Sequence, residues 1–99
     1  MATEIYELQA RFDSKRSFYG KAHVLSTRRY VKLQSYDTIV AIYDRESELL
    51  SVLPNNVYAE KGKYSMTTQR HIREFARQLE FSPSAKYYVG TYNKNGERL

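Results

Sequence analysis

The sequence predicts an α+β fold, in which an antiparallel meander of four to six strands has one α-helix packed across one face, at about residues 66–81. Short apolar segments alternate with polar turns over the first half of the chain, which is typical of consecutive antiparallel strands. A single later segment has a clear helical period. Because 99 residues leave no room for a second core, we expect one domain at residues 1–93, followed by a mobile tail at 94–99.

The strands are predicted from alternation. In residues 4–12, apolar and polar side chains alternate, so one face of an extended segment meets the core. The residues of that face are Tyr6, Leu8, Ala10 and Phe12. Further strands are expected at residues 21–27, 29–35, 38–43, 48–53 and 86–92, with a short one at 57–58. The segment 38–43 is apolar on both faces, which indicates a central strand or one that reaches into an interface between copies.

The strand at 29–35 has a weaker alternation with two distinct faces. Val31 and Leu33 share one face, which we expect toward the core. The other face carries Tyr30, Lys32 and Gln34.

The helix is predicted from a four-residue apolar face with spacing i, i+3, i+4 and i+7. That face consists of Ile72, Phe75, Ala76 and Leu79. Ser65 or Thr67 is the expected N-cap, because either hydroxyl can accept a bond from the first-turn amides. Pro83 is expected to end the helix, since proline disfavours helical geometry in the residue before it.

An arginine stripe lies opposite that apolar face. Arg70, Arg73 and Arg77 fall within about 60° of one another on a helical wheel. Three guanidinium groups there could each fork onto a phosphate or a carboxylate. The alternative is that Glu74 and Glu80 pair with these arginines, at about 0.2–0.5 kcal/mol per pair.

Charge is spread unevenly along the chain. The net charge of +5 combines a local +6 at residues 11–32, −3 at 37–48 and +4 at 61–86. Such an uneven distribution of charge favours anionic partners, namely nucleic acid or an acidic protein surface. The alternative is that the charge serves only to keep the protein in solution. We therefore select a second candidate binding group, in which tyrosine could stack on bases. It consists of Lys15, Arg16, Arg28, Arg29, Tyr30, Lys32 and Tyr36.

Candidate catalytic residues are few. His23 and His71 are the only histidines, and His71 lies beside the apolar face of the helix, where a packed or capping role is expected. Asp44, Glu46 and Glu48 cluster at a turn, where solvated acids are routine. Cysteine, a glycine-rich phosphate loop and a Gly-x-Ser-x-Gly elbow are all absent from the sequence. We expect no enzyme, no metal site and no cofactor.

The sequence also bears on the compartment. No basic segment followed by an apolar run begins the chain, so no signal peptide is expected. The longest apolar run, residues 39–42, is far shorter than the roughly 20 residues that span a membrane. We expect a cytoplasmic protein.

Three stretches carry a resemblance to a known group. They are Phe-Asp-Ser-Lys-Arg-Ser-Phe-Tyr-Gly-Lys-Ala at residues 12–22, Ser-Tyr-Asp-Thr-Ile-Val-Ala at 35–41, and Tyr-Ser-Met-Thr-Thr-Gln-Arg-His-Ile-Arg-Glu-Phe at 64–75. Together they resemble small uncharacterised proteins of Firmicutes bacteria and their phages. The resemblance implies an intracellular, phage-encoded accessory protein and assigns no role to any residue. Phage proteins of this size bind nucleic acid or block host defences, including CRISPR nucleases.

Three functions follow as expectations. The leading one is a non-enzymatic protein that binds nucleic acid or a nucleoprotein through its Arg, Lys and Tyr surface. The second is a protein-directed inhibitor of a host defence nuclease, of the anti-CRISPR type, that acts by stoichiometric binding. The third is a homo-oligomeric structural protein, which the apolar segment 39–42 favours.

Overall fold

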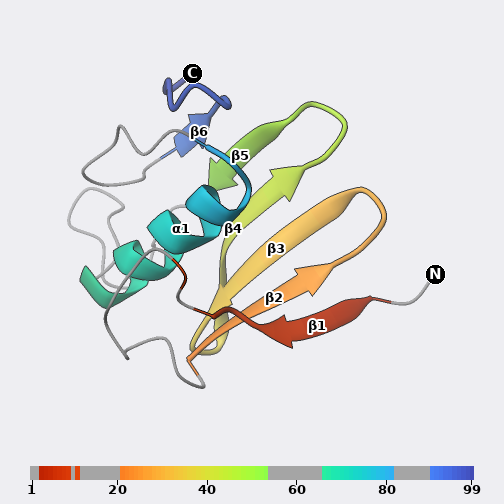
Figure 1. Cartoon of the computed structure of the whole chain (residues 1–99), viewed down its shortest axis with the longest axis vertical. Coiled ribbons are helices and arrows are strands. Elements are labelled where there is room, and N and C mark those ends of the chain that lie inside the picture. The colour runs from red at the N-terminus through yellow and green to blue at the C-terminus, as the bar shows by residue number, and fades with distance from the viewer. Residues whose placement is uncertain (1–2, 10, 12–20, 54–65, 82–89) are drawn as a thin grey trace.

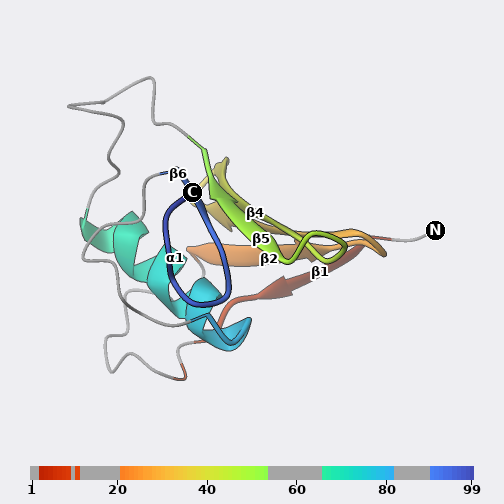
Figure 2. The same ribbon diagram turned by 90° about the horizontal axis from the view of Figure 1, so that it is seen from above.

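A computed structural model describes residues 3–9, 11, 21–53, 66–81 and 90–99. It shows a six-stranded antiparallel sheet with one helix against it (Figure 1). The elements are β1 (Glu4–Glu7), β2 (Ala22–Ser26), β3 (Tyr30–Ser35), β4 (Thr38–Asp44), β5 (Leu49–Val52), α1 (Met66–Gln78) and β6 (Gly90–Tyr92). The strands lie in the sheet in their chain order, from β1 to β6. The predicted meander with one covering helix is therefore confirmed, and α1 lies on one face of the sheet only (Figure 2).

Strand alternation divides the sheet into an inner face, toward α1, and an outer face. Val31 and Leu33 are buried on the inner face, as predicted. Lys32 pairs with Leu25 and with Ile42, so these three residues share the outer face. A register shift between Leu33 and Gln34 interrupts the pairing of β3 with β4.

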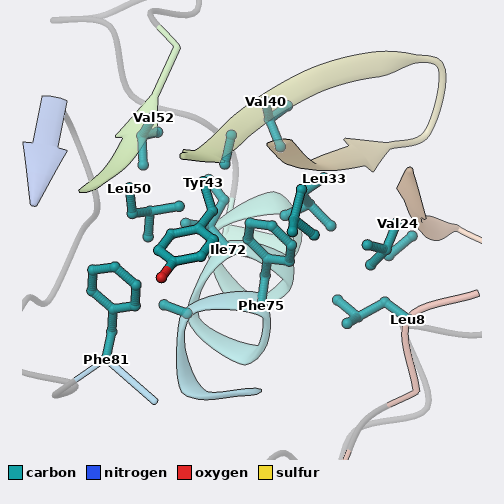
Figure 3. Packing of buried hydrophobic residues seen from close by; sticks show 14 of the residues in the cluster. Leu8, Val24, Leu33, Val40, Tyr43, Leu50, Val52, Ile72, Phe75 and Phe81 are labelled. Atoms are coloured by element: carbon teal, nitrogen blue, oxygen red, sulfur yellow. The ribbon is translucent and has the colours of Figure 1, made fainter. Parts of the chain in front are cut away.

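The core lies between the inner face and α1. Ile72, Phe75 and Ala76 are at most 2% exposed and confirm the predicted apolar face of the helix. Figure 3 shows Phe75 and Ile72 pointing from α1 toward the strand residues. Leu79 is partly buried and packs against the same cluster. Leu8, just after β1, joins this core, and the strands contribute Ala22, Val24, Val31, Leu33, Val40, Ala41, Tyr43, Leu50, Val52 and Tyr92.

The ends of the helix differ from the prediction. Thr67 lies inside α1 and is not its N-cap, while Ser65 and Pro83 lie outside the described residues. α1 ends earlier than expected, because Glu80 takes a positive φ of 68°. The N–H of Glu80 donates to the carbonyl of Arg77, and the N–H of Phe81 donates to that of Ala76, both at 3.0 Å. These two bonds form a Schellman motif with a glutamate at the position that glycine usually takes.

The first strand is shorter than predicted. β1 ends at Glu7, and Tyr6 is 49% exposed instead of packing in the core. Tyr6 pairs with Val24 on the inner face, but α1 covers the other end of β1, where Leu8 is buried (Figure 2). The remaining residues of the predicted face, Ala10 and Phe12, and the predicted strand at 57–58 lie outside the described residues. The last strand begins at Gly90 within the predicted range.

Residues 93–99 fold back along β6. Tyr92 and Arg98 form an antiparallel bridge, and the N–H of Leu99 donates to the carbonyl of Thr91 at 2.8 Å. Lys94 binds the end of the helix, since its Nζ lies 2.5 Å from the carbonyl oxygen of Leu79. The predicted tail at 94–99 therefore has defined contacts, and its mobility stays a prediction.

Candidate nucleic-acid interface

Three stripes of side chains run along α1. The apolar stripe faces the sheet, as described above. At about 100° per residue, His71, Glu74 and Gln78 fall on one flank and form what we call the polar stripe. Arg70, Arg73 and Arg77 fall on the other flank and form the arginine stripe.

The first member of the polar stripe is tied to the sheet. His71 is fully buried, and its Nδ1 lies 2.8 Å from the Oγ of Ser35 at the end of β3. The same Oγ lies 3.1 Å from the Oγ1 of Thr68. The ring of Tyr36 is 6.1 Å from the His71 ring, centroid to centroid. This histidine is packed and hydrogen-bonded inside the protein, which agrees with the role that the sequence predicted.

The other two members hold the chain that leaves β1. Glu74 is only 2% exposed, and its Oε1 accepts the N–H of Arg11 at 3.0 Å. Its Oε2 accepts the amide of Gln78 at 2.7 Å, and that amide also donates to the carbonyl of Gln9 at 2.6 Å. The Glu74 carboxylate therefore turns inward and carries out a structural role. Pairing of Glu74 with the arginines, the alternative that the sequence allowed, stays a prediction.

The arginine stripe is less exposed than predicted. Arg77 is exposed, whereas Arg70 and Arg73 are half-buried. The bond between Arg11 and Glu74 places a fourth, exposed arginine beside α1. Sequence reasoning missed Arg11, because the contact joins positions far apart in the chain and only the inward turn of Glu74 creates it.

The second candidate group is divided. Arg28 is exposed at the turn between β2 and β3, and Arg29 beside it binds an acid at the end of β4 and another in the turn between β4 and β5. The guanidinium of Arg29 lies 3.3 Å from Asp44 and 3.5 Å from Glu46, and 5.2 Å from the ring centre of Tyr30. The hydrogen bond from Arg29, followed by the N–H of Glu46, lowers the pKa of Asp44, and the same contact with Asp44 raises the pKa of Arg29. Arg29 thus joins two hairpins.

The two basic groups do not come together among the described residues. Tyr30 and Lys32 lie on the outer face of the sheet, and α1 covers the inner face. Tyr36, 50% exposed, lies at the opposite end of β3 from Arg28. Lys15 and Arg16 lie outside the described residues. α1 with Arg11 is therefore the described surface that gathers the most arginines on one side.

Comparison with known proteins gives one match. The model of a protein family covers residues 6–90 of the chain. The chain belongs to the family of unknown function DUF8033. No curated protein and no solved structure matches it. The family match spans the chain from the second half of β1 to the start of β6 and includes both arginine groups.

Two further observations concern the described part of this DUF8033 chain. Its residues contain no cluster of three or more His, Cys, Asp or Glu side chains placed to hold a metal ion. Its one described helix is too short and too polar to cross a membrane.

Proposed function

We propose that this DUF8033 protein is a non-enzymatic nucleic-acid-binding protein that contacts phosphates through the arginine stripe of α1. The inward turn of Glu74 carries the proposal. Glu74, which lies among Arg70, Arg73 and Arg77 in the sequence, is buried and accepts hydrogen bonds from the N–H of Arg11 and the amide of Gln78. This carboxylate is therefore turned away from solvent, while Arg77 and Arg11 are exposed.

This arrangement suits phosphate better than base recognition. Seven of the thirteen residues of α1 are buried, so the helix does not stand clear of the protein to enter a groove. Gln69 is fully buried, and the amide nitrogen of Gln78 donates to Gln9 and Glu74 of the same chain, so neither amide is well placed to reach a base edge. Arginine contacts to the backbone would fix the nucleic acid with little dependence on its sequence.

Fluorescence anisotropy with a labelled duplex at rising salt tests the proposal. Three phosphate contacts predict a slope of about −2.7 for log affinity against log salt, or about 40-fold weaker binding at 200 mM than at 50 mM salt. Replacing Arg77 with Gln should make the slope shallower by about 0.9, because one contact is lost. Absence of binding at low salt, or binding that salt does not weaken, would overturn the proposal.

Arg28→Gln is the matched control. It removes the same charge from an exposed position at the far hairpin turn. We expect its slope to equal that of the unchanged protein. A loss equal to or greater than that of Arg77→Gln would exclude the arginine stripe as the interface.

The resemblance to proteins of Firmicutes and their phages supports a phage-encoded protein in the bacterial cytoplasm. It also supports a second function that competes with nucleic-acid binding. A protein-directed inhibitor of a host defence nuclease, of the anti-CRISPR type, would form a stoichiometric complex without affinity for free nucleic acid. Capture from a bacterial lysate, with and without nuclease treatment, separates these outcomes. Capture that disappears after nuclease treatment supports the nucleic-acid proposal, whereas a protein partner retained after treatment favours the inhibitor.

A further inference from the structure

The two edge strands of the sheet, β1 and β6, differ in their backbone pairing. At the β6 edge, the returning chain pairs with the strand through the bridge between Tyr92 and Arg98 and the bond from Leu99 to Thr91. At the other edge, β1 pairs with β2 and with no further strand among the described residues. Figure 1 shows β1 at the rim of the sheet, with the C-terminal segment beside β6 at the opposite rim. Proteins usually protect such edges, because unpaired backbone groups can bind another strand.

One hydrogen bond shows which residues of β1 direct their backbone groups toward β2. The N–H of Leu8 donates to the carbonyl of Ala22 at 2.9 Å, so these two residues form a hydrogen-bonded pair. Such pairs alternate along an antiparallel ladder, which makes Tyr6 and Glu4 the next residues bonded to β2. The backbone N–H and C=O of Ile5 therefore point away from β2, toward the outer side of β1.

The side chains of β1 do little to protect that edge. Ile5 is 66% exposed and Tyr6 is 49% exposed, and they lie on opposite faces at the centre of the strand. No proline interrupts β1, and its pairing with β2 has no bulge. Glu4 and Glu7 at the two ends are its charged residues.

We propose that β1 is a self-association site, at which a second copy of the chain pairs antiparallel about a two-fold axis at Ile5. The closed β6 edge favours this partner. Head-to-tail pairing would need β1 of one molecule to bind the β6 edge of the next, which the molecule's own C-terminal residues already occupy. Symmetric pairing uses the open edge of both copies and ends at a dimer.

The charges of β1 select the register. An axis at Glu4 or at Glu7 would place that carboxylate opposite its own copy, which is unfavourable. An axis at Tyr6 would place Ile5 opposite Glu7. With the axis at Ile5, the two isoleucines meet, and each glutamate faces a neutral residue of the other copy, Thr3 or Tyr6. This register also brings outward-pointing backbone groups opposite one another.

The outer face gives the dimer a continuous row of side chains. Ile5 pairs with Leu25, Leu25 with Lys32, and Lys32 with Ile42 across the strands. With the axis at Ile5, this row runs directly into its copy, and the exposed isoleucine gains an apolar neighbour. The strand is short and the contact is small, so association should depend on protein concentration.

Light scattering over a range of protein concentrations tests the proposal. The unchanged protein should pass from monomer to dimer mass as concentration rises. Ile5→Lys should remain monomeric, because two cations would meet on the axis, and its folding is checked by circular dichroism. Leu99→Lys, at a 68% exposed leucine near the closed edge, is the matched control and should still dimerise. A protein that stays monomeric throughout, or a dimer that Ile5→Lys leaves intact, would overturn the proposal.

Cysteine cross-linking tests the register. The sequence contains no cysteine, so only the introduced cysteine can form a disulfide. In the proposed dimer the two Ile5 Cα atoms are about 5.5 Å apart, which a disulfide can bridge. Ile5→Cys should therefore form a covalent dimer under mild oxidation. Glu7→Cys lies about 13 Å from its own copy along the strand and should not. Equal cross-linking of both variants, or of neither, contradicts the register.

Discussion

Asp44 gives the described structure a defined pH response. Arg29 and the N–H of Glu46 lower the pKa of this carboxyl group in the folded protein. The stability from this contact is present above the unfolded-state pKa of about 3.9 and is lost as the pH falls through the lower folded-state pKa. We expect Arg29→Gln to make the fall in unfolding free energy between about pH 4 and pH 2 shallower. Urea unfolding at several pH values measures this slope, with Arg28→Gln as the control. Equal slopes for the two variants would contradict the assignment.

Single side chains also show where sequence reasoning ends. The spacing of Arg70, Arg73 and Arg77 predicted one stripe on the helix, but it did not show that two of them are half-buried. The direction of Glu74 was not predictable, because a glutamate four residues from an arginine has the same spacing whether it faces solvent or the protein interior. A carboxylate is buried only where donors meet it, and here the donor is a main-chain N–H 63 residues away in the sequence.

The C-terminus of α1 offers a direct test of helix termination. Glu80 holds a positive φ, which costs a non-glycine residue free energy. Glu80→Gly should therefore raise the free energy of unfolding by about 0.5–1 kcal/mol, as seen from the denaturant midpoint. Ser47→Gly, at an exposed turn residue without a positive φ, should lower it or leave it unchanged. Destabilisation by Glu80→Gly would show that the side chain, and not the backbone, matters there.

The buried contact between α1 and β3 makes a second test. Ser35→Ala leaves the Nδ1 of His71 without its hydroxyl partner in a fully buried site, so the free energy of unfolding should fall by about 1–3 kcal/mol. Ser51→Ala is the control, since Ser51 is half-buried and its bond to Thr91 is long at 3.3 Å. Thermal unfolding of both variants decides the point, and equal losses would show that the Ser35 contact with His71 is not stabilising.

Elements were easier to predict than their ends. The alternation in β3 and the apolar face of α1 are both local patterns, and both were correct in the structure. The end of α1 was predicted from Pro83, yet Glu80 ends the helix, because residue 80 has to turn so that Phe81 can enter the core. The exposure of Tyr6 depends on how far the helix reaches over the sheet, which no local pattern encodes.

At the scale of the whole molecule, the order of the strands was predictable and the surfaces were not. Short polar turns predict neighbouring strands, and the sheet follows chain order from β1 to β6. Whether the arginines of α1 and Lys32 share a face depends on which side of the sheet the helix covers. The alternation in β3 predicts from the sequence which side chains face the core. The neighbours of Arg11, Arg70 and Arg77 depend on how segments far apart in the chain pack, so the sequence does not predict them.

The position of α1 in the chain order has a kinetic consequence. β2, β3, β4 and β5 follow one another through short turns, whereas β5 and β6 lie on either side of α1 in the chain. Closing a longer loop costs more entropy, so β6 should join the sheet after β2, β3 and β4 have paired. Pulsed hydrogen exchange during refolding should protect the amides of Leu33 and Ala41 before that of Tyr92. The β6 edge of the sheet would then be the last part of the molecule to form, and until it forms β5 would be the edge strand that meets other newly made chains.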